Sequence, residues 1–68
     1  MRDIAKRIKE IRTENKMSQV QFGKALFVSQ DTISLWEKGK SLPGTEHVIL
    51  MAEKFGVSAD YILCLKDE

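Results

Sequence analysis

The sequence predicts an all-α fold of five short helices, and two patterns lead to this prediction. Apolar residues recur three or four positions apart along most of the chain, which places them on one face of a helix. Serines that can cap helix N-termini, together with glycine and proline, separate these apolar stretches. At 68 residues the chain is near the lower size limit for folding without metal ions or disulfides. We therefore expect a single domain that covers residues 1–68.

The first helix is predicted from residue 3 to about residue 15. Ile4, Ile8 and Ile11 follow the i, i+4, i+7 pattern of a buried stripe. Arg7 lies on another face, where we expect it to be solvated. Arg12 lies at the edge of the apolar stripe, and a charged side chain in that position requires a partner.

The second helix is predicted to begin with a capping box formed by Ser18 and Gln21, in which each side chain accepts the other residue's backbone N–H. It runs over about residues 19–26, with Phe22 and Leu26 facing inward. A helix this short is stable only when it packs against other elements, so the pattern implies close neighbours.

A third helix is predicted over residues 30–38, after a tight turn. Ser29 can cap its N-terminus, and Gly39 can provide a left-handed stop. Ile33 and Trp36, three positions apart, bury its inner face. The other face carries amide, hydroxyl and apolar side chains at the spacings that a helix needs to read base edges in a major groove. A polar, solvated face is the alternative that composition alone favours.

The last two helices follow turn signals. The fourth is predicted to start from a cap at Thr45, after the Pro43–Gly44 turn, and to run to about Phe55. The fifth is predicted over about residues 59–65, capped by Ser58. A core this small cannot bury all the apolar residues of the fifth helix, so this helix is the candidate surface for self-association. The residues concerned are Tyr61, Ile62 and Leu65.

One stretch and its continuation carry a resemblance to a known family. Residues 18–39 contain Ser18, Gln19, Phe22, Gly23, Leu26, Val28, Ser29, Thr32, Ile33, Ser34, Trp36, Glu37 and Gly39 at matching places. The match continues through Pro43, Met51, Ala52, Phe55, Gly56, Val57, Ser58, Asp60, Tyr61, Ile62 and Leu63. In these residues the chain resembles the lambda-repressor-like (Xre/Cro) family of helix-turn-helix DNA-binding domains. The resemblance covers nearly the whole chain, which makes it more specific than a two-helix match.

The resemblance implies a compact five-helix domain that binds duplex DNA through its third helix. The base contacts that it implies are Gln30, Asp31, Ser34 and Leu35. Gln30 suits adenine, Asp31 can accept from a cytosine amino group, and Leu35 can touch a thymine methyl group. The phosphate contacts that it implies are Gln19, Arg12, Lys38, Lys40 and Ser41. Gln19 is also placed to brace Gln30.

The resemblance further pairs Arg12 with Glu37, which would lock the first helix to the end of the third. Two residues depart from the family pattern. Gly23 stands where the family usually has alanine, and a small residue there lets the third helix cross close by. Phe27 occupies a turn position where the family usually has glycine, because the backbone φ is positive there. A bulky residue with positive φ is strained by about 1–2 kcal/mol.

Charge is unevenly distributed along the chain. The net charge of +1 combines +4 in residues 1–44 with −3 in residues 45–68. A basic front and an acidic back can orient a domain on DNA, although the same split can arise by chance in a short chain.

These features bound the function. The sequence has one cysteine, no nucleophile–base pair and no glycine-rich phosphate loop, so we expect no enzyme activity, cofactor, metal or small-molecule ligand. It has no membrane-spanning run and no signal peptide, so a cytoplasmic protein is expected. The resemblance implies transcriptional regulation, with repression favoured, by a homodimer on a near-palindromic operator. The alternative is a protein-interaction module, such as an antitoxin or adaptor, held through the apolar C-terminal helix.

Overall fold

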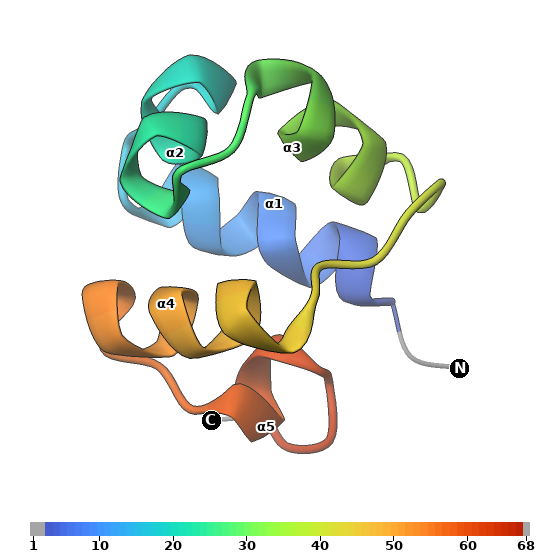
Figure 1. The fold of residues 1–68 in the computed structure, drawn as a ribbon. Coiled ribbons are helices and arrows are strands. Elements are labelled where there is room, and N and C mark those ends of the chain that lie inside the picture. Colours follow the sequence, from blue (N-terminus) through green and yellow to red (C-terminus); the bar gives the residue numbers. More distant parts are fainter. Residues whose placement is uncertain (1–2, 68) are drawn as a thin grey trace.

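The computed structural model describes residues 3–67 and is all-helical over that range (Figure 1). Its helices are α1 (Ile4–Glu14), α2 (Gln19–Leu26), α3 (Gln30–Glu37), α4 (Thr45–Phe55) and α5 (Ala59–Ile62). The predicted all-α fold of five helices is therefore confirmed, and α2 has the predicted bounds.

α1 crosses the middle of the molecule, with α2 and α3 on one side and α4 and α5 on the other (Figure 1). α2 packs against α3, α3 packs against α1, and α4 packs against α5. Contacts between α2 and α4 and between α1 and α5 join the two sides. Every helix is thus supported by a neighbour, as helices of this length require.

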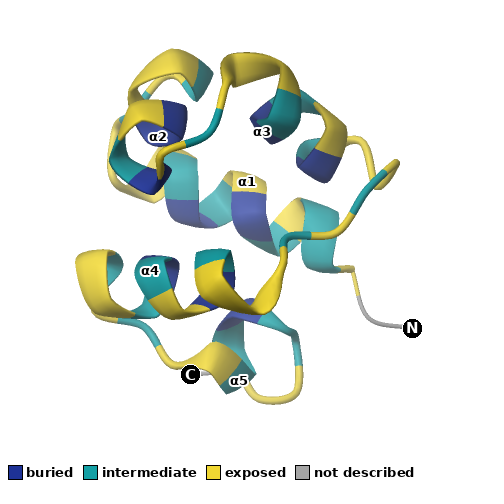
Figure 2. Cartoon of the chain, in the orientation of Figure 1, coloured by how far each residue is buried: buried dark blue, intermediate teal, exposed yellow. Residues whose placement is uncertain are grey.

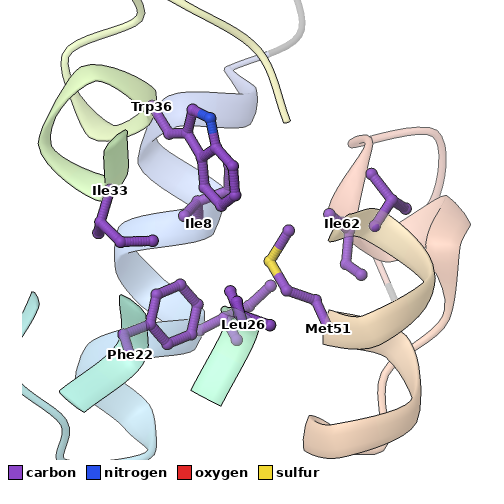
Figure 3. Close-up of a cluster of buried hydrophobic side chains, with 9 residues drawn as sticks. Ile8, Phe22, Leu26, Ile33, Trp36, Met51 and Ile62 are labelled. Atoms are coloured by element: carbon purple, nitrogen blue, oxygen red, sulfur yellow. The ribbon is translucent and has the colours of Figure 1, made fainter. Parts of the chain in front are cut away.

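The apolar stripes of all five helices meet in one core (Figures 2 and 3). Its buried members are Ile8, Ile11, Phe22, Leu26, Ile33, Trp36, Val48, Met51 and Ile62. Trp36 is only 3% exposed, and Phe22 stacks on the half-buried Phe55 with 5.2 Å between the ring centroids. The predicted burial of Ile33 and Trp36 is confirmed, and it fixes which side of α3 can face outward.

Serine side chains cap three of the helices as predicted. The backbone N–H of Gln21 donates to Ser18 Oγ at 3.1 Å, and the Ser18 N–H donates to Gln21 Oε1 at 2.9 Å, which completes the capping box. Ser29 Oγ accepts from the backbone N–H of Thr32 at 3.2 Å. Ser58 Oγ accepts from the backbone N–H of Tyr61 at 3.0 Å. Local sequence alone specifies these helix starts.

The predicted cap of α4 was wrong. Thr45 is the first helical residue, and the N-cap is Gly44, which makes no side-chain capping bond. The Gly44 carbonyl already accepts the backbone N–H groups of His47 and Val48, each at 3.1 Å. The helix therefore begins one residue earlier than a cap at Thr45 would require.

The predicted extent of α5 was also wrong, because the helix ends at Ile62 and not at residue 65. Cys64 has a φ of 60°, and the backbone N–H groups of Leu65 and Lys66 both turn back to the Asp60 carbonyl, at 2.8 and 3.3 Å. A left-handed residue of this kind closes the last turn and stops the helix.

Ile62 was predicted as part of a self-association surface, and this prediction is corrected. Its side chain is fully buried in the core beside Met51 (Figure 3), so it is not available to a second molecule. Leu65 is 50% exposed and Tyr61 is half-buried. The burial of Ile62 follows from the short α5 packing back against α4 and α1.

Arg7 is not the solvated residue that the sequence predicted. Its guanidinium carbon lies 4.0 Å from the centroid of the Tyr61 ring, and its Nη1 donates to the Tyr61 carbonyl. These contacts join α1 to α5 and cover one face of the tyrosine. Stacking of a cation on an aromatic ring explains why a charged side chain lies this close to the core.

Candidate nucleic-acid interface

The turn between α2 and α3 depends on two residues with unusual requirements. Phe27 ends α2 in the left-handed conformation, with a φ of 61°, and its side chain is 77% exposed. The positive φ expected at this position is therefore confirmed. The backbone N–H of Val28 donates to the Gly23 carbonyl at 2.9 Å, which pulls the turn against α2.

Gly23 is needed because of this turn. A Cβ added there would lie 2.7 Å from the Val28 carbonyl oxygen, a distance that real Cβ atoms essentially never show. The sequence predicted that the third helix passes close to Gly23. Instead, the backbone of the turn that leads into α3 lies against this glycine. Gly23 and Phe27 together therefore set how closely α3 follows α2.

Arg12 and Glu37 form the predicted ion pair between α1 and the end of α3. Arg12 Nε donates to Glu37 Oε2 at 2.7 Å, and Arg12 Nη2 donates to Oε1 at 3.0 Å. The Glu37 side chain is 5% exposed and the Arg12 side chain 13%. Hydrogen bonding to Glu37 raises the pKa of Arg12 above its ordinary value, so the guanidinium stays charged at neutral pH.

A third contact of Arg12 was not predicted. Arg12 Nη1 donates to the Met17 carbonyl at 2.9 Å, just ahead of the α2 capping box. Three of the five guanidinium N–H groups are therefore engaged within the protein, and two are left. Arg12 thus holds the start of α2 and the end of α3 in one arrangement.

The polar network continues to the N-terminus of α3. Gln19 Nε2 donates to Glu37 Oε1 at 3.2 Å, and Gln30 Nε2 donates to Gln19 Oε1 at 3.4 Å. The expected bracing of Gln30 by Gln19 is present, although the second bond is long. A continuous chain of polar contacts therefore runs from Arg12 through Glu37 and Gln19 to Gln30.

The outward face of α3 is accessible (Figure 2). Gln30 and Asp31 are exposed in its first turn, and Leu35 is 43% exposed one turn further on. Ser34 is half-buried. These four residues were predicted as base contacts, and they share one side of the helix over its two turns.

The loop after α3 carries the predicted lysines. Gly39 has a φ of 72°, and its backbone N–H donates to the Trp36 carbonyl at 3.1 Å. The Lys40 backbone N–H donates to the Leu35 carbonyl at 3.0 Å. These bonds hold the loop against the end of α3, where Lys38 and Lys40 are exposed and Ser41 is half-buried.

Residues 3–67 offer neither a cluster of metal ligands nor a membrane-spanning helix. That part of the chain contains no group of three or more histidine, cysteine, aspartate or glutamate side chains that could hold a metal ion. None of the helices in the same range is long and apolar enough to cross a membrane.

A two-helix unit with a tight turn, a buried inner face on its second helix and a lysine-bearing loop defines a helix-turn-helix DNA-binding domain. The chain belongs to the helix-turn-helix family, of the lambda-repressor-like type, whose sequence model matches residues 8–62. The resemblance inferred from the sequence is thereby confirmed.

Two curated relatives share about a third of their residues with the chain over the matched region. The HTH-type transcriptional activator BcrR of Enterococcus faecalis is 33% identical over 57 residues, which are 84% of this chain and 28% of that protein. The antitoxin PezA of Streptococcus pneumoniae is 33% identical over 55 residues, which are 81% of this chain and 35% of that protein. The chain therefore spans only about a third of either relative.

Solved structures agree with the fold. The P22 c2 repressor protein, in a crystal structure with a synthetic operator, has a TM-score of 0.81 and 32% identity over 88% of this chain and 91% of that one. The solution structure of its DNA-binding domain gives a TM-score of 0.80 at the same identity, over 88% and 79% of the two chains. A transcriptional regulator from Listeria innocua, at 22% identity, shares the fold with a TM-score of 0.89 over 100% of this chain and 64% of that one.

Proposed function

We propose that this chain binds a specific duplex DNA operator through α3 and regulates transcription. The observation that carries the proposal is the polar network that ends at Gln30. The amide of Gln30 is held by Gln19, which is held by Glu37 and, through it, by Arg12. An amide positioned in this way at the start of an exposed helix face can form two hydrogen bonds with an adenine edge without first losing much rotamer freedom.

The contact set follows from exposure and charge. Base edges are read by Gln30, Asp31, Ser34 and Leu35. Phosphates are bound by Lys38, Lys40, Ser41, Gln19 and the two remaining Arg12 N–H groups. If two molecules together neutralise six to eight phosphates, affinity falls with salt at a log–log slope of roughly −5 to −7.

The bound form is a homodimer on a near-palindrome, with two copies of α3 in successive major grooves about 34 Å apart. The exposed Leu65 and the outer part of Tyr61 supply apolar surface for the contact between copies. The operator-bound P22 c2 repressor, similar over 88% of this chain, supports DNA as the partner.

The test is selection of bound duplexes from a random-sequence pool, followed by sequencing. A recovered palindrome with half-sites about ten base pairs apart is the expected result. A folded protein that recovers no motif would contradict the proposal.

Repression is the direction of regulation that we propose. A reporter gene behind a promoter that carries the recovered site measures this direction. We expect loss of reporter signal. A gain of signal would instead indicate activation, the role for which the relative BcrR is named.

A second candidate function is an antitoxin or adaptor role. The similarity to the antitoxin PezA favours it, as does the exposed apolar Leu65 after α5. Pull-down with the Leu65→Glu variant as control separates the two candidates. A protein captured by the unchanged chain and lost with Leu65→Glu, in the absence of any recovered DNA motif, would favour the interaction module.

A further inference from the structure

The outermost stripe of α3 consists of Asp31 and Leu35 and continues into Lys38, the C-cap residue of the helix. They stand at i, i+4 and i+7, so they lie one above another along one side of the helix. All three are exposed, whereas Ser34 beside them is half-buried. Ile33 and Trp36 form the buried side of α3, opposite this stripe. If α3 enters a groove, the stripe therefore reaches the base edges first.

The carboxylate of Asp31 is free to meet a base. Within residues 3–67 it makes no hydrogen bond or ion pair, whereas the neighbouring Gln30 has its amide engaged by Gln19. Asp31 lies in the first turn of α3, beside the positive end of the helix dipole. The group thus presents only acceptor oxygens, which need a donor.

The identity of that donor follows from the groove code. Guanine presents two acceptors and thymine a carbonyl and a methyl group, so both would set an acceptor against the carboxylate. Adenine presents its amino group beside N7, and this acceptor would also repel a carboxylate. Cytosine presents an amino group and no acceptor, so Asp31 selects cytosine largely by repelling the alternatives.

Leu35 adds a second requirement. It lies four residues after Asp31, a rise of about 6 Å along the helix axis. Neighbouring base pairs are about 3.4 Å apart along each strand, so this rise is less than two base-pair steps and the two side chains meet the same base pair or neighbouring ones. A half-exposed leucine gains most from apolar contact, and the major groove offers methyl groups for this purpose.

We propose that Asp31 and Leu35 act as one reading unit for a cytosine amino group with a methyl group next to it in the major groove. The methyl group belongs either to an adjacent thymine or to C5 of the same cytosine. This inference rests on the proposed function, because it needs α3 to lie in the major groove.

The experiment uses the duplex recovered by selection and measures the affinity of the unchanged chain and of variants. N4-methylcytosine at the selected cytosine keeps Watson–Crick pairing but removes the donor in the groove. It should weaken binding by about 5-fold or more, the low end for a good base contact. Asp31→Asn should prefer adenine at this position and lose its sensitivity to N4-methylcytosine.

Two further duplexes separate the sources of the methyl group. Uracil in place of the adjacent thymine should weaken binding if thymine supplies it, and 5-methylcytosine should strengthen binding if the cytosine itself does. Leu35→Ala should abolish whichever response is seen. If neither duplex changes the affinity, the role of Leu35 is overturned.

Glu53→Gln is the matched control, because it removes the same charge from an exposed position on α4. It should raise affinity for all duplexes slightly and leave the selected sequence unchanged. If Asp31→Asn recovers the same motif as the unchanged chain, the inference is overturned while the proposed function stands. If the unchanged chain recovers no motif, both fail.

Discussion

Arg12 of α1 and Glu37, the last residue of α3, face each other in a two-bond ion pair, with donor–acceptor distances of 2.7 and 3.0 Å. The pair connects residues 25 positions apart, and Glu37 Oε1 accepts from both Arg12 Nη2 and Gln19 Nε2. It therefore holds the helix that we propose to read DNA and the glutamine that braces Gln30. Stability and recognition depend here on the same atoms.

The first prediction concerns this pair. Glu37→Gln should lower the free energy of unfolding by about 3 kcal/mol, because it leaves the Arg12 charge largely buried without a counter-charge. Urea denaturation measures the change. Lys66→Ala is the control, since its ion pair with Asp60 is mostly solvated and should contribute less than about 1 kcal/mol.

A double variant sharpens this test. Replacing both partners with apolar residues, Arg12→Met with Glu37→Leu, should restore much of the stability, because no buried charge is left unpaired. Equal loss in the double and single variants would show that the arginine acts through packing and its bond to the Met17 carbonyl.

The second prediction concerns the strained turn. Phe27→Gly should raise the free energy of unfolding by about 0.5 kcal/mol. Relief of about 1–2 kcal/mol of left-handed strain is partly offset by glycine entropy and by loss of the contact between the Lys54 ammonium and the ring. Phe27→Ala is the control, because alanine has the same backbone restriction. If both variants destabilise the protein equally, the ring contributes more than its 77% exposure suggests.

The third prediction concerns Gly23. Gly23→Ala should destabilise the protein by about 1–2 kcal/mol, although alanine is the better helix former by about 1 kcal/mol, because its Cβ would press on the Val28 carbonyl. Thermal denaturation measures the shift. Gly56→Ala separates steric from backbone effects, since Gly56 has a positive φ but open space around it. A stabilised Gly23→Ala variant would show that the turn moves freely.

The fourth prediction separates base reading from phosphate binding. Gln30→Ala should weaken binding to the selected site by about 1–3 kcal/mol and leave binding to random DNA nearly unchanged. Lys40→Ala should weaken both and reduce the magnitude of the salt slope by about one. Fluorescence anisotropy titrations at several salt concentrations measure both variants. Equal losses for the two variants on all sequences would contradict the assignment of α3 as the reading helix.

Several features of the protein were determined by the sequence itself. The bounds of α2 and the caps at Ser18, Ser29 and Ser58 were predictable from the residues themselves. Each depends on contacts within three or four residues, where side-chain type decides the hydrogen bond. The left-handed backbone at Phe27 was predicted only by the family resemblance, because a bulky side chain does not favour a positive φ. Hydrophobic spacing also predicted most of the core, because helix periodicity puts those residues on one face.

Only the tertiary structure decided other features. Ile62 is buried and α5 is short because the chain after α4 folds back onto α1, where Arg7 meets Tyr61, 54 positions away. Gly23 is restricted by the carbonyl of Val28, which local patterns do not locate. Likewise, the bond from Arg12 to the Met17 carbonyl depends on how α1 meets the start of α2, and the pair of Arg12 with Glu37 was predicted only through the family resemblance. Such contacts arise from packing between segments distant in sequence, so no periodicity or capping rule within one segment specifies them.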